Sequence, residues 1–404
     1  MYSSQVITSA DSASTNWVAI WALFLAGCTL AVHVGKFPAA LPLLVSEFDL
    51  SLVQSGNLVS IYALLIAFGA LLVGVIVARV GYVPFAIAGV GFCMLGSLIG
   101  SVATSVSMLL IGRSVEGLGW LVGVVALPTI LSTLSAKKDL PVVMGLWGAF
   151  MPIGASAMLF LAPLLHALGG WRLSWMVATV LSLLGVIAVV VICRQQREIL
   201  KPLRFVGSAG KLNDLRSRES LSALLCFMCY SFQYVAVTAF LPILLVQDSG
   251  MSLAYASYWA ALVMLANAVG NLASGWLIKF GLKQYQILAF ASLFMGITAW
   301  VALSIPITPV RIVAAILMTG VSGVIPGTLF STATVLASSS AGVGIIIGFM
   351  LTGTGLGQLL GPIALTRAVD WSSHWYVGGI MCLLVGVLGA LFAMWLRQLP
   401  SASD

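Results

Sequence analysis

The sequence predicts an all-α integral membrane protein with twelve transmembrane helices. Three observations support this prediction. Hydrophobic residues make up 61% of the 404 residues, and charged residues only 7%, whereas soluble proteins carry about 25% charged residues. The apolar residues form blocks of about 20 to 30 residues, long enough to cross a hydrocarbon layer of about 30 Å. The second half also repeats features of the first. This composition excludes cytosolic enzymes, nucleic-acid-binding proteins and disordered proteins.

The predicted membrane helices follow one another with short polar joints between them. The twelve apolar blocks are 17–45, 52–77, 82–104, 106–135, 139–168, 172–193, 219–247, 252–277, 285–305, 309–337, 341–369 and 373–397. One joint differs from the others, because 194–218 carries seven Lys or Arg residues. It divides the chain into a tail (1–16), an N-terminal six-helix bundle (17–193), a basic loop (194–218), a C-terminal six-helix bundle (219–397) and a final tail (398–404).

The distribution of Lys and Arg predicts the orientation. If both termini are cytoplasmic, thirteen of these residues fall on the inner side and three on the outer side, which are Arg172, Arg311 and Arg367. Cytoplasmic segments of membrane proteins carry such an excess of positive charge. We therefore expect a multi-pass protein of the inner (cytoplasmic) membrane with both ends in the cytoplasm. The polar segment before the first block lacks a signal peptide's basic flank and cleavage site.

The two halves of the chain resemble each other at an offset of about 200 residues. LPLLV (41–45) returns as LPILL (241–245), and Gly74 and Gly81 correspond to Gly275 and Gly281. Repeated halves of six helices predict two pseudo-symmetric bundles around a central cavity.

Motifs near the ends of the second and fourth spans resemble those of the major facilitator superfamily. The loop segment GVIVARVG (74–81) contains Gly74, Arg79 and Gly81, but Ala78 stands where the family has Asp. The segment RSVEGLG (113–119) matches the helix 4 motif and includes Gly117. The run PVVMGLWG (141–148) resembles the cyanate and nitroimidazole transporter branch. The resemblance implies alternating access through rocking of the two halves, with these residues and Pro152 in gating roles.

Four ionisable side chains fall well inside predicted spans, whereas every other charge fits a joint or the end of a span. His33 and Lys36 share a face of the first span, and Arg113 and Glu116 are three residues apart in the fourth. Charges inside a membrane are costly and usually functional. We expect Lys36, His33 and Arg113 to face the cavity and bind an anionic group, and His33 and Glu116 to carry a coupled proton. The alternatives are a Lys36 satisfied by a helix-end carbonyl, and an internal Arg113–Glu116 ion pair that braces the bundle.

Further polar and aromatic residues complete the predicted solute site. Gln233 aligns with His33 in the repeat, and Tyr234 follows it. Trp147 and Asn267 are expected to line the cavity as well. Cys226, Met228 and Cys229 leave a copper site as an alternative, because soft sulfur ligands suit Cu(I). We otherwise expect neither a resident metal nor a cofactor, and the six cysteines lie in or beside apolar blocks, so no disulfides are expected.

The sequence as a whole predicts a secondary active transporter, not an enzyme. The expected cargo is a small anionic or polar organic solute, taken up together with a proton. No nucleotide-binding GxxxxGK[ST] motif is present. We expect a monomer in contact with membrane lipid and no nucleic-acid partner. The alternatives are a multidrug or nitro-compound exporter, a copper importer and a non-transporting membrane sensor.

Overall fold

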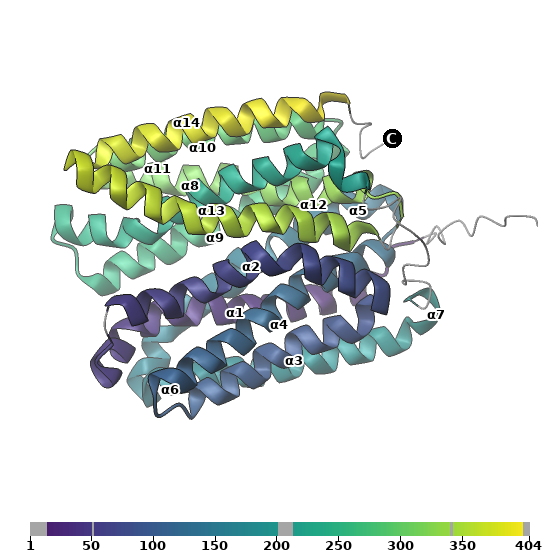
Figure 1. Cartoon of the computed structure of the whole chain (residues 1–404), viewed down its shortest axis with the longest axis horizontal. Coiled ribbons are helices and arrows are strands. Elements are labelled where there is room, and N and C mark those ends of the chain that lie inside the picture. The colour runs from purple at the N-terminus through teal and green to yellow at the C-terminus, as the bar shows by residue number, and fades with distance from the viewer. Residues whose placement is uncertain (1–13, 51, 201–212, 340–341, 399–404) are drawn as a thin grey trace, which may run out of the picture.

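The computed structural model describes residues 14–50, 52–200, 213–339 and 342–398, and this part of the chain is helical with no strand. Most of the predicted tails and half of the basic loop lie outside the described residues. The long helices run side by side (Figure 1). They are α1 (Trp17–Phe48), α2 (Leu52–Val80), α3 (Tyr82–Ser101), α4 (Val106–Thr133), α5 (Leu140–Gly148), α6 (Phe150–Gln195), α8 (Arg218–Ser249), α9 (Leu253–Lys279), α10 (Gln284–Ser304), α11 (Thr308–Ser322), α12 (Val324–Leu336), α13 (Val343–Ser372) and α14 (Trp375–Met394).

Short helical segments lie in two of the joints and after the last long helix. Those in the joints are η1 (Lys137–Asp139), α7 (Arg197–Leu200) and η3 (Asn213–Arg216), and η5 (Trp395–Gln398) follows α14.

The 46 residues of α6 form two membrane spans. At 1.5 Å per residue they would reach about 69 Å, twice the thickness of a hydrocarbon core. The helix turns back at Gly169 and Gly170, whose backbone angles are not helical, and Gly170 has a φ of 66°. A left-handed φ favours glycine, which lacks a Cβ atom. Among the described residues, eleven helical segments are long and apolar enough to cross a membrane. Division of the longest one at this turn gives the twelve predicted spans.

Two spans are broken near a proline. α5 and α6 meet at Ala149, three residues before Pro152, and α11 and α12 meet at Gly323, three residues before Pro326. Proline has no N–H to donate to the preceding turn, and its ring crowds that turn. The sequence predicted each of these spans as one block, and the proline explains why the structure divides them.

The helices form two bundles that meet mainly through α2, α5 and α6 on one side and α9 and α13 on the other. In the N-terminal bundle α1 packs on α6 and α3 on α4, and in the C-terminal bundle α10 packs on α14 and α8 on α13. Between the bundles, α2 lies against α13 (Figure 1), and α5 and α6 lie against α9. The fold class is therefore as predicted.

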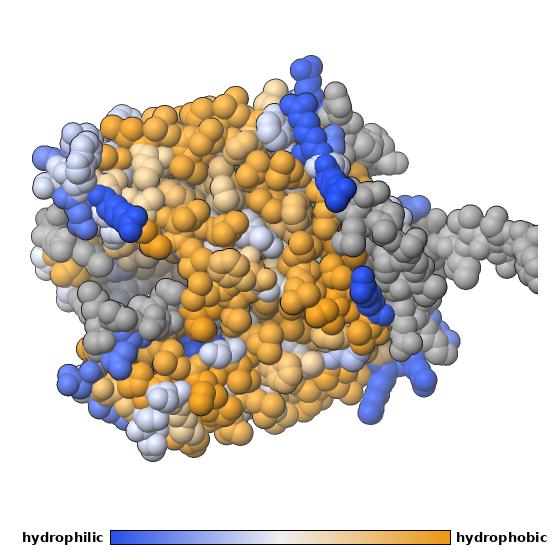
Figure 2. Space-filling view, viewed as in Figure 1, coloured by the Kyte–Doolittle hydropathy of each residue, from blue (hydrophilic) through white to orange (hydrophobic). Residues whose placement is uncertain are grey.

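Polar residues gather at the two ends of the molecule. Figure 2 shows a broad apolar surface between hydrophilic groups at opposite ends. Leu72, Leu168, Val269 and Phe290 are among the exposed apolar side chains, with more than 60% exposure each. Such a surface suits the hydrocarbon of a bilayer. We call the end with Arg79, Lys138 and Lys279 the basic end.

The bundles approach through backbone contacts near the basic end. A Cβ atom on Gly74 of α2 would lie 2.8 Å from the carbonyl oxygen of Gly344 on α13. A Cβ atom on Gly145 of α5 would lie 2.7 Å from the carbonyl oxygen of Asn271 on α9. Small residues let helices approach closely in membranes. The Asp139–Lys279 ion pair, at 3.5 Å, joins the bundles at the same end.

Candidate functional site

Glu116 is the centre of a charged cluster inside the N-terminal bundle. One of its oxygens, Oε1, lies 2.5 Å from Lys36 Nζ, and the other, Oε2, lies 2.8 Å from Arg113 Nη1. The three side chains come from α1 and α4. The internal ion pair, one of the two predicted alternatives for Arg113 and Glu116, is present, and Lys36 extends it to a second helix.

Neighbouring groups complete the coordination of the two cations. Lys36 Nζ donates to Ser97 Oγ at 2.6 Å and lies 4.5 Å from the centre of the Trp175 ring. Arg113 Nη1 donates to the carbonyl oxygen of His33 at 3.1 Å, and its guanidinium lies 4.2 Å from the centre of the Tyr62 ring. A positive charge over an aromatic face is stabilised by the electrons of the ring.

The contacts of His33 assign its protonation. Lys36 Nζ lies 3.1 Å from His33 Nδ1, and an ammonium group can only donate, so Nδ1 accepts. His33 Nε2 then carries the proton and donates to Ser182 Oγ at 2.7 Å. Glu116 Oε1 is farther from Nδ1, at 3.5 Å. His33 is therefore neutral here, and it can accept a proton at Nδ1 only after Lys36 moves away.

The structure corrects the expected orientation of Lys36 and His33. Both side chains are 0% exposed, as is Glu116, so none of the three faces a water-sized cavity. The helix-end alternative for Lys36 does not apply either, because its ammonium contacts side chains in the middle of the bundle. Arg113 is 4% exposed, and its Nε has no hydrogen-bond partner among the described residues.

The cluster holds two formal positive charges and one negative charge. A buried charge is costly unless it is paired and hydrogen-bonded. Glu116 of α4 therefore stabilises both cations. Lys36 belongs to α1 and contacts α3 and α6, so the cluster connects α4 with three other helices of its bundle.

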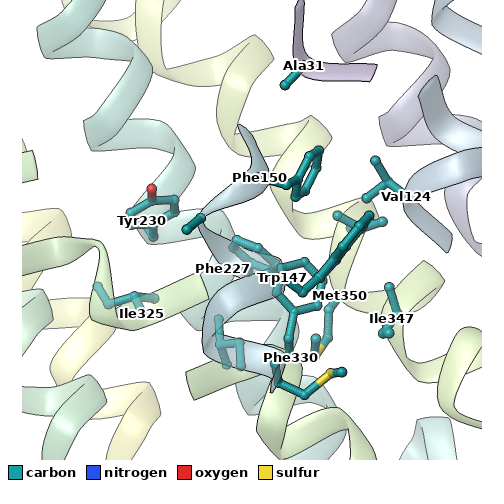
Figure 3. Packing of buried hydrophobic residues seen from close by; sticks show 14 of the residues in the cluster. Ala31, Val124, Trp147, Phe150, Phe227, Tyr230, Ile325, Phe330, Ile347 and Met350 are labelled. Carbon is teal, nitrogen blue, oxygen red and sulfur yellow. The ribbon is translucent and has the colours of Figure 1, made fainter. Parts of the chain in front are cut away.

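A pocket lies between the two bundles. Its volume is about 80 Å³, room for two or three water molecules at about 30 Å³ each. Aromatic rings form much of the wall, and Figure 3 shows Phe150 of α6, Phe227 and Tyr230 of α8 and Phe330 of α12 around Trp147. The lining residues are Trp120, Val124, Gly148, Phe150, Met151, Pro152, Phe227, Tyr230, Ser231, Tyr234, Val235, Asn267, Pro326, Phe330, Leu351, Thr354 and Gln358.

The polar groups of this pocket are uncharged. Trp120 Nε1, Tyr234 OH and Thr354 Oγ1 are buried and have no hydrogen-bond partner among the described residues. Buried polar atoms normally have partners, so these three are available to a bound molecule. Tyr230 OH is engaged, because the Nδ2 of Asn267 donates to it at 3.1 Å.

The predicted solute-binding residues separate into two groups. Tyr234 and Asn267 line the pocket, and so does Pro152, which was predicted in a gating role. Trp147 lies behind the wall, where its ring stacks on Phe150 at 4.3 Å between centres. Gln233 is fully buried inside its own bundle and donates from Nε2 to the Cys229 carbonyl at 3.2 Å. The expectation that Gln233 faces the cavity is therefore corrected.

Most of the pocket residues escaped the sequence prediction, and four of them show why. Phe150, Phe227, Phe330 and Thr354 carry no charge and stand in apolar blocks, where aromatic residues are common. One signal was present, because Phe227, Tyr230 and Tyr234 recur every three or four residues and so share a face of α8.

The predicted gating residues lie at helix contacts and turns. Gly74 contacts α13, and a Cβ atom on Gly117 would lie 2.8 Å from the Leu65 side chain of α2. Gly81 has a φ of 123° in the turn between α2 and α3, and Arg79 is exposed beside it. Their gating role stays a prediction.

The structure also places the remaining charged and sulfur groups. Arg311, predicted on the outer side, is buried at the start of α11, where its Nε donates to the carbonyl oxygen of Ala302 at 3.0 Å. All six cysteines are free thiols. Among the described residues no group of three His, Cys, Asp or Glu side chains could hold a metal ion.

One aromatic contact connects the pocket with the charged cluster. The Trp120 ring, which lines the pocket, lies 6.4 Å from the Tyr62 ring. Tyr62 OH is 3.2 Å from Arg113 Nη1 and 3.3 Å from Glu116 Oε2. A displacement of the Trp120 side chain would therefore be transmitted to the charged cluster through one side chain, that of Tyr62.

The fold, the repeated bundles and the pocket between them agree with a match in sequence. Residues 19–362 match the family model of the Major Facilitator Superfamily. The chain belongs to the Major Facilitator Superfamily. No curated protein sequence matches the chain. The resemblance to the cyanate and nitroimidazole branch stays a prediction.

Solved structures of superfamily members share the fold. The transporter FucP in its outward conformation superposes with a TM-score of 0.73 at 16% identity, covering 93% of this chain and 97% of that one. A variant of the E. coli fucose:proton symporter FucP gives a TM-score of 0.69 at 16% identity, with 92% and 97% covered. The human organic anion transporter MFSD10 (TETRAN) gives 0.72 at 16% identity, with 93% and 98% covered.

Proposed function

We propose that this transporter carries a small, uncharged polar organic solute, bound in the pocket between the two bundles. The observation that carries the proposal is the set of polar atoms without partners, Trp120 Nε1, Tyr234 OH and Thr354 Oγ1, among aromatic walls from both bundles. Binding sites for small molecules combine apolar walls with a few directed polar groups. Because both bundles contribute, their rocking would expose the solute to one side at a time.

An uncharged solute fits the pocket better than an anion. None of the lining residues has a charged side chain, and an anion in an apolar site without a counter-charge would be costly. The anionic solute remains the second candidate because of Arg113, whose Nε has no partner and which lies behind Tyr62. The relatives of similar fold include both a fucose:proton symporter and an organic anion transporter.

The transporter is expected to work in the inner membrane as a monomer, with the basic end in the cytoplasm. This orientation follows from the excess of Lys and Arg at that end. The alternative is a multidrug or nitro-compound exporter, which would move its solute out of the cell. The two differ in a measurable way, because an exporter lowers the solute content of the cell. The copper importer and the non-transporting sensor stay alternatives from the sequence alone.

The pocket variants Tyr234→Phe and Thr354→Val are expected to weaken solute binding about 2- to 10-fold each, because each removes one hydrogen bond to the solute. The measurement is the rise in thermal stability of the purified protein with a panel of neutral polar compounds, small anions and cationic drugs, since a ligand of the folded state raises its stability. Tyr376→Phe, an exposed tyrosine on α14, is the matched control. Stabilisation by anions alone, with both variants equal to wild type, would contradict the uncharged-solute proposal.

Proton coupling is the proposed source of energy, and the charged cluster around Glu116 is its proposed site. Protonation of Glu116 would release Lys36 and Arg113 from their common partner, and Tyr62 connects that change to the pocket wall. Uptake by energised cells is therefore expected to collapse when a protonophore is added. Uptake that continues unchanged under the protonophore, with the membrane potential shown to be dissipated, would rule out proton coupling.

A further inference from the structure

A second cavity lies on the outer face of the C-terminal bundle, away from the solute pocket. Its volume is about 670 Å³, within the range of about 300–1,000 Å³ typical of small-molecule sites. We call it the α9–α10 groove. Helices α9 and α10 form its walls, and α11 with the start of α12 forms its floor. Both wall helices pack on α11 and barely touch each other, so a gap stays open between them.

Small side chains give the groove its depth. Gly270 and Ala273 of α9 and Gly320 of α11 lie along it. A Cβ atom on Gly320 would meet nothing closer than 3.7 Å, so the floor has free space at this point. At the rim, Val269 is 68% exposed and Phe290 is 65% exposed. The groove therefore opens on the apolar surface that faces lipid.

The shape and lining of the groove fit a hydrocarbon chain. On α9 the lining runs from Val269 to Leu277, and these nine residues span about 12 Å along the helix axis. Gln286 is the one polar side chain of the lining, and it lies near the basic end. If the groove were empty, its lining side chains would lack van der Waals contacts on the open side. An acyl chain supplies these contacts.

A positive charge stands at the basic end of the groove. Lys283 is exposed at the N-cap of α10, between the lining residues Leu282 and Gln286. Lys279, four residues earlier at the end of α9, is paired with Asp139, whereas Lys283 makes no ion pair within the part of the chain that the structure describes. The start of a helix carries a partial positive charge, so Lys283 and the first turn of α10 together suit a phosphate group.

We propose that the α9–α10 groove binds one anionic phospholipid, with an acyl chain between α9 and α10 and the phosphate beside Lys283. The two features are independent, because the groove follows from small side chains on α9 and α11 while the charge belongs to the turn before α10. The groove runs along the bundle and Lys283 lies at its basic end, where α10 begins. This arrangement matches a lipid whose acyl chain lies along the helices and whose headgroup lies at the basic end. This proposal does not depend on the identity of the solute.

Two variants test the two parts of the site in the purified full-length protein. Gly320→Leu fills the floor, and Lys283→Ala removes the charge. The matched controls are Gly91→Leu, at a position on α3 where an added Cβ meets nothing within 4 Å, and Lys138→Ala, an exposed lysine of the basic end on the other bundle. Thermal unfolding is followed in detergent with added phosphatidylglycerol or phosphatidylcholine, each variant being compared with its own lipid-free state.

Phosphatidylglycerol is expected to raise the unfolding temperature of the wild type and both controls more than phosphatidylcholine does. Gly320→Leu and Lys283→Ala are each expected to lose at least half of that difference, and native mass spectrometry should show one retained lipid in the wild type and the controls. Lys283→Arg, which keeps the charge, should restore the wild-type response. The proposal is wrong if either test variant keeps the full difference, or if the two lipids act equally on the wild type.

Discussion

Glu116→Gln is expected to destabilise the N-terminal bundle by about 3–5 kcal/mol, the usual effect of removing one member of a buried ion pair. Glu116 contacts both Lys36 and Arg113, and all three side chains are at least 95% enclosed. The substitution keeps the shape of the side chain but leaves two positive charges without their common partner. Chemical unfolding in mixed micelles measures the change in the free energy of unfolding.

A double variant separates charge from packing. Lys36→Met together with Glu116→Gln removes one positive and one negative charge, so the buried excess of charge returns to its original value. Because replacing both members of a buried pair is often close to neutral, the double variant should be more stable than Glu116→Gln alone. If Glu116→Gln unfolds like the wild type, the cluster does not stabilise the bundle.

Gly74→Leu is expected to reduce transport at least ten-fold while the protein still folds. A side chain at this position meets the Gly344 backbone of α13, with the Cβ atom 2.8 Å from a carbonyl oxygen. Overpacking costs about 1–3 kcal/mol, equivalent to a change of roughly 5- to 150-fold in the ratio of two conformations. The clash exists only while α2 and α13 touch at the basic end, so the variant should favour the conformation in which this end is open.

The change of conformation can be measured separately from transport. Ser274→Cys places a thiol on α9 where Ser274 is fully buried near α5 and α12. This thiol should react faster with a water-soluble reagent when Gly74→Leu is also present than in the variant with Ser274→Cys alone. Gly74→Leu without Ser274→Cys gives the background from the native cysteines. Gly91→Leu is the control for added bulk. Equal labelling with and without Gly74→Leu, or full transport by Gly74→Leu, would contradict a gate at this contact.

Only some of the residues of the solute pocket could be recognised from the sequence. Tyr234 and Asn267 are polar residues in apolar blocks and were therefore noticed, whereas Phe227 and Phe330 look like ordinary apolar residues in the sequence. They become wall residues because α8 and α12 meet across the pocket. The repeat also aligned Gln233 with His33, and both are buried inside their own bundles. The alignment identified equivalent positions but not the direction in which they point.

By itself, the sequence determined the membrane class, the twelve spans and the superfamily, because apolar blocks of bilayer length and the repeat of two halves are properties of the chain alone. It also identified the four ionisable residues of the charged cluster, His33, Lys36, Arg113 and Glu116. Only the tertiary structure decided that Lys36 turns toward Glu116 and not toward the pocket. The rotation of a helix about its axis is set by its neighbours, and the partners of Lys36 and His33 include Ser97, Trp175 and Ser182, which stand far away in the sequence. The same holds for the α9–α10 groove, which exists because two helices pack on a third without packing on each other.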